Sequence, residues 1–405
     1  MGNAMTVENV LTLDRIYQAA HTIKPIVRKT GLIRAVNIAP DCEMYLKTEN
    51  LQVTGSFKVR GAYFKLSRLT PEEKKRGIVA CSAGNHAQGV ALSAKENGIK
   101  STIFIPSAAP ISKIEATRSF GAEIRLVNGV YDDAYSAAVD FLNESGAVFV
   151  HPFDDFDVIA GQGTIGLEIL ERLPDVEAVV APVGGGGLIS GVAYAIKKLN
   201  PTCKVYGVQA AGAKSMSNSL DKNERVSDGA STFADGIAVK SPGKLTFPLC
   251  SEYVDEVVTV TDDEIATALL TLMEKQKLVA EGAGAVSVAA VMSGKLPVQG
   301  KRTVSIVSGG NIDVNILSRV INRGLLTAGR LTELTIELLD MPGQLNRVSG
   351  IIADSGANVV KVRHDPAGEN SDINGCYLHV SMETKDRRHL QEIRGALSKA
   401  GYKLN

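Results

Sequence analysis

The chain of 405 residues contains no tryptophan, and aromatic residues make up only 5% of it. Lysine and arginine together number 44, as do aspartate and glutamate, so the formal net charge is zero. Nucleic-acid binding relies on clustered positive charge and on aromatic rings that stack on bases. This composition therefore argues against a nucleic-acid partner.

Long apolar runs and closely spaced cysteines are missing as well. No uninterrupted stretch of about 20 apolar residues is present to span a membrane, and the N-terminus does not resemble a signal sequence. The five cysteines are widely separated and form no Cys-x-x-Cys pair. We therefore expect a cytoplasmic protein with free thiols and no membrane partner, long enough for two or three domains.

What the chain does contain is a set of glycine-rich segments at the ends of apolar runs. Residues 183–191 include four consecutive glycines, follow the apolar run 176–182 and precede a helical pattern. Glycines let several backbone N–H groups converge on one point, and a helix start adds unpaired donors. The segment lacks the patterns of nucleotide-binding loops. It predicts a site for a phosphate monoester; a tight turn is the alternative.

Two further segments have the same layout. Ser308-Gly309-Gly310-Asn311 follows the apolar run 303–307, which places a hydroxyl at the carboxyl end of a strand, where ligands collect in parallel sheets. Residues 81–89 precede another helical pattern, with Asn85 as the expected helix cap. The N–H groups there are suited to a carboxylate, although a cap without a ligand would look similar.

Lys58 is the candidate reactive group. It lies in residues 49–62 among small, polar and apolar neighbours. A lysine removed from water loses solvation of its ammonium form, so its pKa falls and the free amine can attack an aldehyde or accept a proton. The alternative is an ordinary surface lysine that opens a helix.

Apolar runs alternate with helical periodicity through most of the chain, which predicts an α/β fold with two parallel sheets. The expected strands are 77–82, 101–106, 123–127 and 147–151, then 178–183, 204–209, 257–260 and 303–307.

The last part of the chain has a different pattern. Strands are expected at 334–339, 359–363 and 376–383, with helices from the turn at 340–345 and over 387–399. With a reduced final strand at 402–404, this order predicts an α+β, ferredoxin-like βαββαβ domain.

Taken together, the motifs resemble the pyridoxal-phosphate enzymes of fold type II (tryptophan synthase β-like), in particular the threonine dehydratases or threonine ammonia-lyases. The resemblance covers residues from about 10 to 325 and also includes Gly161-Gln162-Gly163-Thr164. It implies a catalytic region at 1–330, with a smaller α/β domain inserted at about 50–152. Residues 331–405 resemble an ACT domain.

The resemblance implies a role for each motif. Catalytic roles fall to Lys58, Ser82 and Glu281, with Lys58 linked to the cofactor as an aldimine. The expected contacts of pyridoxal phosphate are Phe57, Lys58, Asn85, Gly184, Gly185, Gly186, Gly187, Leu188 and Ser308. The expected contacts of the substrate carboxylate are Ser82, Ala83, Gly84, Asn85 and His86.

The activity implied is α,β-elimination on a hydroxy amino acid: L-threonine would give 2-oxobutanoate and ammonia, and L-serine would give pyruvate. A serine-preferring dehydratase or racemase is the alternative within enzymes. A sensor that keeps a vestigial catalytic body is the alternative outside them. We expect a homodimer or homotetramer.

Departures from related enzymes refine this expectation. Serine racemases of the group carry a second acid/base serine where this chain has Ala83. Some relatives bind a divalent cation through acidic residues where this chain has Gln209, Ala213 and Ser215, so we expect no metal. Asp235 resembles a residue that lines the site.

In the ACT-like domain, Gly343 would let the backbone approach an amino-acid effector, and Asn358 could bond to it. A dimerisation sheet that binds nothing is the alternative, because fold alone does not fix function.

Overall fold

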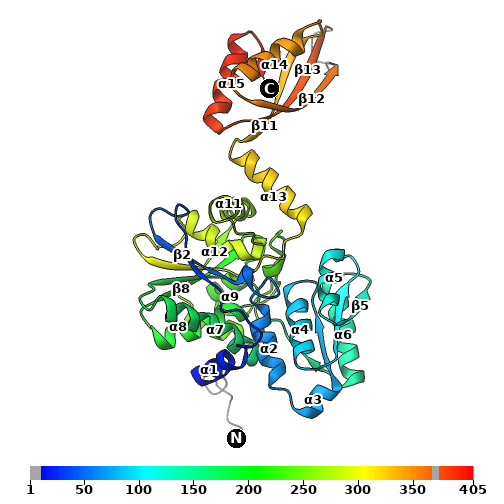
Figure 1. Cartoon of the computed structure of the whole chain (residues 1–405), viewed down its shortest axis with the longest axis vertical. Coiled ribbons are helices and arrows are strands. Elements are labelled where there is room, and N and C mark those ends of the chain that lie inside the picture. The colour runs from blue at the N-terminus through cyan, green and yellow to red at the C-terminus, as the bar shows by residue number, and fades with distance from the viewer. Residues whose placement is uncertain (1–10, 367–373, 405) are drawn as a thin grey trace. The chain divides into compact units, whose positions relative to one another are not determined.

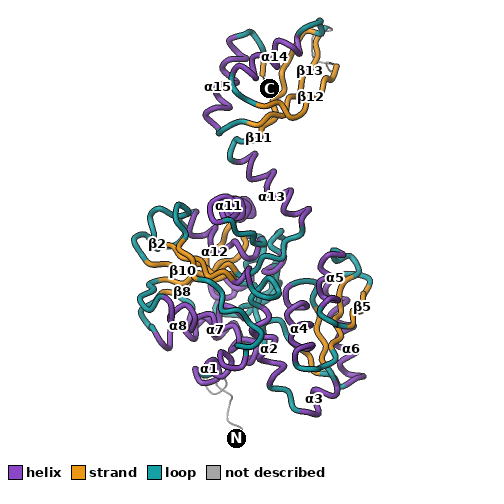
Figure 2. Tube along the Cα trace, viewed as in Figure 1, coloured by secondary structure: helices purple, strands orange, loops and turns teal. Residues whose placement is uncertain are grey.

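The structure, a computed structural model, describes residues 11–366 and 374–404. It divides into two compact units, one up to Val314 and the other from Asn315 on. The first unit contains two separate sheets with helices around them, and the described part of the second contains one sheet with the helices α13, α14 and α15 (Figure 1, Figure 2). The expected α/β fold with a C-terminal α+β domain is confirmed.

The larger sheet of the first unit has six strands in the order β1-β2-β10-β7-β8-β9, all parallel except β1. Its strands are β1 (Leu32–Arg34), β2 (Glu43–Thr48), β7 (Ala178–Pro182), β8 (Lys204–Ala210), β9 (Glu256–Val260) and β10 (Arg302–Val307). The four last named agree with the expected strands to within about two residues at each end. The sequence did not predict β1 or β2.

Helices cover both faces of this sheet (Figure 1). One face packs against α1 (Leu13–Thr22), α7 (Phe156–Arg172), α8 (Gly187–Leu199) and α10 (Thr246–Tyr253). The strands also contact α12 (Gly282–Met292), which is backed by α11 (Asp262–Thr271). The shorter elements are α9 (Ser215–Lys222), η2 (Glu49–Leu51), η3 (Asp235–Ile237) and η4 (Leu272–Gln276).

The smaller sheet has four parallel strands in the order β5-β4-β3-β6. These are β3 (Ile78–Cys81), β4 (Ser101–Pro106), β5 (Glu123–Val127) and β6 (Val148–Phe149). The helices of this region are α2 (Lys58–Ser67), α3 (Pro71–Arg76), α4 (Asn85–Glu96), α5 (Ile111–Ser119) and α6 (Tyr131–Ser145). One face packs on α4 and the other on α6, so both sides of the sheet are buried.

The second unit begins with α13 (Val314–Thr327) and continues as the expected βαββαβ order. Its elements are β11 (Leu331–Leu339), α14 (Gln344–Asp354), β12 (Asn358–Pro366), β13 (Gly375–Glu383), α15 (Arg387–Lys399) and β14 (Lys403–Leu404). The strands form an antiparallel sheet in the order β12-β13-β11-β14. The expected limits of the domains at 50–152 and at 330 stay predictions. Among the described helices, none combines the length and apolar character that crossing a membrane requires.

A buried cluster of charges joins α2 to the larger sheet. Arg60 donates to both oxygens of Glu49 at 2.8 Å and to both oxygens of Glu168 at 2.7 and 3.0 Å. Lys47 adds a bond to Glu168 at 2.5 Å. Arg60, Glu49 and Lys47 are at most 1% exposed, so their charges are compensated by one another rather than by water.

Replacing Arg60 with methionine should strongly destabilise the first unit. The substitution leaves two carboxylates, Glu49 and Glu168, with the single cation of Lys47, and an uncompensated buried charge costs about 3 to 5 kcal/mol. Urea unfolding followed by circular dichroism measures the loss. Lys29→Met is the matched control, because Lys29 pairs with Glu171 at the surface, where such a pair contributes less than about 1 kcal/mol. Equal stability of the two variants would contradict the argument.

Candidate active site

Lys58 is the first residue of α2, and its amine is turned inward. The Nζ atom donates a hydrogen bond to the carbonyl oxygen of Pro152 at 2.8 Å and lies 5.2 Å from the ring centroid of Phe57. Burial lowers the pKa of Lys58 to about 8, although the negative charge of Glu281 opposes the shift. At pH 7 this amine is still mostly protonated, but its uncharged, reactive fraction is far larger than that of an ordinary lysine.

Close backbone contacts hold Lys58 in place. A Cβ atom on Gly89 of α4 would lie 3.1 Å from the carbonyl carbon of Lys58, and a Cβ on Gly161 of α7 would lie 2.5 Å from the Cα of Gly61. Only glycine permits this approach of α4 and α7 to α2. The N–H of Phe57 also bonds to the carbonyl oxygen of Ser308 at 3.1 Å, so the start of α2 is tied to the end of β10.

Three polar side chains form a chain of hydrogen bonds beside the lysine. Asn85 donates to Glu281 at 2.6 Å and accepts from Asn311 at 2.7 Å. Burial, and then repulsion by Asp235, raise the pKa of Glu281 to about 7. The prediction that Asn85 caps its helix is wrong, because Gly84 occupies the cap position without a side-chain bond and Asn85 reaches Glu281 instead.

The start of α4 presents unpaired donors. The hydroxyl of Ser82 accepts the N–H of Gly84 at 3.2 Å. Within the described residues, the N–H groups of Ala83, Asn85 and His86 have no protein acceptor. These N–H groups, at the positive end of the helix dipole, suit a carboxylate.

His86 has a structural role in this arrangement. Its Nε2 atom bonds to the carbonyl oxygen of Val150 at 2.8 Å, so this nitrogen carries the proton. Burial, and then the positive charge of Lys58, lower the pKa of His86 to about 3, which keeps the ring neutral. His86 thus contributes its backbone to the site and not an acid.

The tetraglycine loop lies between β7 and α8. In the part of the chain that the structure describes, the N–H groups of residues 184–188 have no protein acceptor, and Gly186 has a φ of 99°. A Cβ on Gly185 would lie 2.4 Å from the ring of Phe153, so no larger residue fits there. The carbonyl oxygen of Gly185 is held by Thr246 Oγ1 at 2.5 Å. The loop is thus fixed through a carbonyl while its donors stay free, which fits a phosphate group.

Ser308 completes the set at the end of β10. It is 2% exposed, and its hydroxyl makes one long contact among the described residues, to the carbonyl oxygen of Ala283 at 3.4 Å. A weakly held hydroxyl can turn to a ring nitrogen. The amine of Lys58, the donors of residues 184–188 and the hydroxyl of Ser308 together fit pyridoxal phosphate, which carries an aldehyde, a phosphate and a pyridine nitrogen.

Several contacts of this site had no signal in the sequence. Pro152 acts through its carbonyl and Phe153 through its packing against glycine, and neither belongs to a motif that the sequence singled out. Asn311 was visible as the end of the motif beginning at Ser308, but its bond to Asn85 depends on the fold. Thr246 lies in a segment that no pattern marked.

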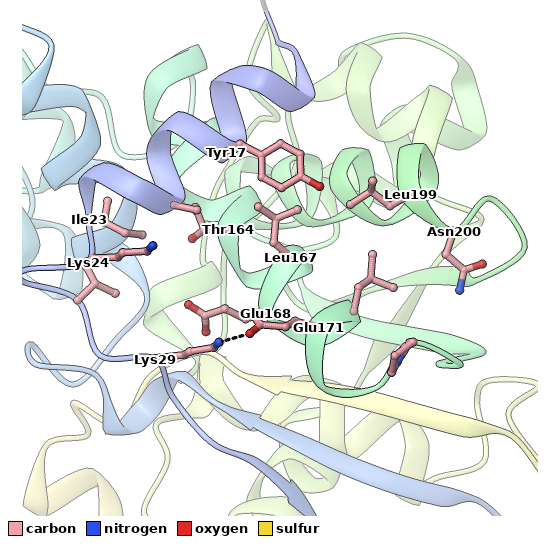
Figure 3. Close-up of a pocket in the computed structure, with 14 residues that line it drawn as sticks. Tyr17, Ile23, Lys24, Lys29, Thr164, Leu167, Glu168, Glu171, Leu199 and Asn200 are labelled. Carbon is pink, nitrogen blue, oxygen red and sulfur yellow. Dashed lines mark hydrogen bonds and ion pairs between the residues drawn. The ribbon is translucent and has the colours of Figure 1, made fainter.

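A cavity of about 720 Å³ lies away from these groups, between α1, α7 and α8 (Figure 3). Tyr17, Leu167 and Leu199 give it apolar walls, and Lys29 pairs with Glu171 at 2.6 Å along one side. Its lining includes neither Lys58 nor the glycine loop. We therefore place the candidate active site at Lys58, where the reactive groups converge.

Comparison with known proteins identifies the family of the chain. Residues 23–309 match the model of the family described as pyridoxal-phosphate dependent enzyme, and residues 332–401 match the ACT domain. An L-threonine ammonia-lyase of Thermotoga maritima is 52% identical over 98% of this chain and 99% of its own.

Solved structures of related enzymes are similar to this chain as well. The processed form of threonine deaminase isoform 2 from Solanum lycopersicum is 37% identical, with a TM-score of 0.73 over 77% of this chain and 94% of its own. Maize serine racemase is 33% identical, with a TM-score of 0.73 over 78% of this chain and 99% of its own. The chain belongs to the pyridoxal-phosphate-dependent enzymes and ends in an ACT domain.

Proposed function

We propose that this enzyme is a threonine ammonia-lyase, which converts L-threonine to 2-oxobutanoate and ammonia and also acts on L-serine to give pyruvate. The observation that carries the proposal is the inward-turned, partly buried amine of Lys58, with its lowered pKa, in a chain that matches a relative of that activity along almost its whole length. The five unpaired cysteines fit a cytoplasmic location, which is part of the proposal.

Each part of the cofactor has a partner in the site. Residues 184–188 would hold the phosphate, Ser308 the pyridine nitrogen, and Asn85 the phenolic oxygen, with Phe57 beside the ring. When bound, pyridoxal phosphate supplies an aldehyde that links to amines and a ring that withdraws electrons from the carbon next to the amine. A hydroxyl at the nitrogen adds no fixed charge, which favours rapid loss of a β-substituent over a long-lived carbanion.

Residues of the chain would supply the other functions, which are orientation of the substrate and proton transfer. The N–H groups at the start of α4, with Ser82, would orient the substrate carboxylate and so align the α-hydrogen with Lys58. With its lowered pKa, the freed amine of Lys58 is suited to accept that proton. Glu281 holds a proton on its carboxyl group up to about pH 7 and is joined to the site through Asn85.

Racemisation is the weaker candidate. It requires a second acid/base group on the opposite face of the substrate, and Ala83 offers no hydroxyl where racemases of this group carry one. The ratio of threonine to serine turnover depends on one methyl group, which is worth about 1 to 3 kcal/mol of discrimination. Parallel assays of 2-oxobutanoate and pyruvate would measure it.

We also propose that the ACT domain binds an amino-acid effector and that the enzyme is a homodimer or homotetramer. Gly343 has a φ of 91° at the start of α14, and no atom lies within 4 Å of the position of its missing Cβ. A ligand can therefore approach the backbone there. Asn358 donates to Glu383 at 3.0 Å, which fixes its amide at the entry of β12.

Lys58→Ala should abolish 2-oxobutanoate formation from L-threonine and remove the visible absorption of the lysine-bound cofactor. Lys65→Ala is the matched control, because Lys65 lies on the same helix but pairs with Asp155 at 2.7 Å, away from the site. It should keep both properties. Turnover or visible absorption retained in Lys58→Ala would overturn the assignment.

Two substitutions should shift the ionisation of Glu281 in opposite directions. Asp235 raises the pKa of Glu281 and Lys113 lowers it. Asp235→Asn should therefore move the corresponding limb of the kcat/KM profile to lower pH, and Lys113→Met should move it to higher pH. The expected size is a few tenths of a pH unit to about one, as is typical of charges near a surface. Shifts in the same direction would show that the limb belongs to another group.

An amino-acid effector should give measurable heat when titrated into the full-length enzyme, and should change the threonine concentration needed for half-maximal rate. Gly343→Ala should weaken this binding, because a Cβ would occupy the open space that the ligand would use beside the backbone. Gly356→Ala is the matched control, since Gly356 also has a positive φ, of 82°, and open space in the same domain. No heat with any amino acid would remove the regulatory proposal.

A further inference from the structure

Three side chains with different donor atoms converge in the second unit. Asp340 follows β11, His364 lies on β12 and Cys376 lies on β13. One oxygen, one ring nitrogen and the sulfur lie within 4.8 Å of one another. No short motif links the three residues, so the sequence alone gives no sign of the cluster.

The register of the sheet explains why they meet. Strand β13 pairs with β11 on one side and β12 on the other, with Cys376 opposite Leu338 and His364 opposite Leu378. Paired residues lie on the same face, and side chains two apart on a strand share a face. Asp340, Cys376 and His364 therefore project to the same side at one end of the sheet.

The three groups are unpartnered, unlike their neighbours. Within the described residues, no hydrogen bond or ion pair engages the carboxylate of Asp340, the ring of His364 or the thiol of Cys376. By contrast, Asp365 pairs with Arg363 at 2.9 Å. A convergence of free donors is expected where a ligand completes the structure.

Exposure of the groups allows an ion to enter. Asp340 and His364 are exposed, whereas Cys376 is 2% exposed and anchored between two strands. A cation that binds there would displace the proton of the thiol to solvent and form a bond to the thiolate.

We propose that Asp340, His364 and Cys376 bind one zinc-class divalent cation. A thiolate, an imidazole and a carboxylate form the mixed donor set that Zn²⁺ accepts at tetrahedral sites, and hard cations such as Mg²⁺ avoid sulfur. Three protein ligands leave the fourth position for water or another donor. The ion would tie the ends of three strands to the turn that carries Gly343.

Cobalt(II) is the probe for this site, because its tetrahedral complexes absorb in the red, where the cofactor does not. The full-length enzyme with bound cofactor is stripped of metal with a chelator and titrated with Co²⁺, and Zn²⁺ is then added as a competitor. One Co²⁺ per chain with tetrahedral bands, displaced by Zn²⁺, is the expected result.

Variants separate this site from others on the chain. His364→Ala and Asp340→Asn change exposed side chains, so both should fold, and each should weaken Co²⁺ binding at least about tenfold. Cys42→Ser is the control, because Cys42 is a free, partly exposed cysteine of the first unit, and its loss should leave binding unchanged. The absence of tetrahedral bands in the native chain, or equal affinity in His364→Ala, would overturn the proposal.

Discussion

The activity that we propose depends on a partly buried amine at the start of α2. Burial lowers the pKa of Lys58, and a single uncharged acceptor, the carbonyl of Pro152, holds it. Two residues later, Arg60 has the opposite setting, since two carboxylates compensate its buried charge. The same helical turn therefore carries Lys58, whose amine can react, and Arg60, whose charge is neutralised by carboxylates. The close approach of α4 and α7 at Gly89 and Gly161 makes this division rigid.

Anion binding in the site relies on backbone donors. The N–H groups at the starts of α4 and α8 offer positive potential without a lysine or arginine side chain. An additional cation beside Lys58 would depress its pKa further, and an additional carboxylate would raise it. In the proposed site, backbone donors would attract a carboxylate and a phosphate without shifting the pKa of the Lys58 amine as a charged side chain would.

The sequence could predict those parts of the site that depend on special backbone geometry. Four consecutive glycines and a lysine among small residues are rare patterns, and the structure places both in the same region. Strand β2 could not be predicted, because Lys47 lies within it and Glu49 follows it, which makes a buried segment look polar. Their charges are compensated by each other, by Arg60 and by Glu168, which lies 121 residues after Lys47 in the chain.

Partners that the local sequence does not reveal also explain other differences between the prediction and the structure. Asn85 is of a residue type that is typical of helix caps. Its side chain instead bonds to Glu281, almost two hundred residues later in the chain. Pro152 contributes a carbonyl oxygen, which every residue has, so no side-chain pattern can reveal it. Local sequence preferences predict helices and strands. Contacts between segments that are distant in the sequence determine which hydrogen bonds the polar groups form.

The pKa of Glu281 links proton transfer to the arrangement of the two sheets. Lys113 on α5, beside the smaller sheet, pairs with Asp235 of η3, beside the larger sheet, at 2.5 Å. At Glu281 their effects oppose each other, since Asp235 raises its pKa and Lys113 lowers it. In this arrangement Lys113 partly offsets the effect of Asp235, so the contact between α5 and η3 contributes to setting the pKa of Glu281.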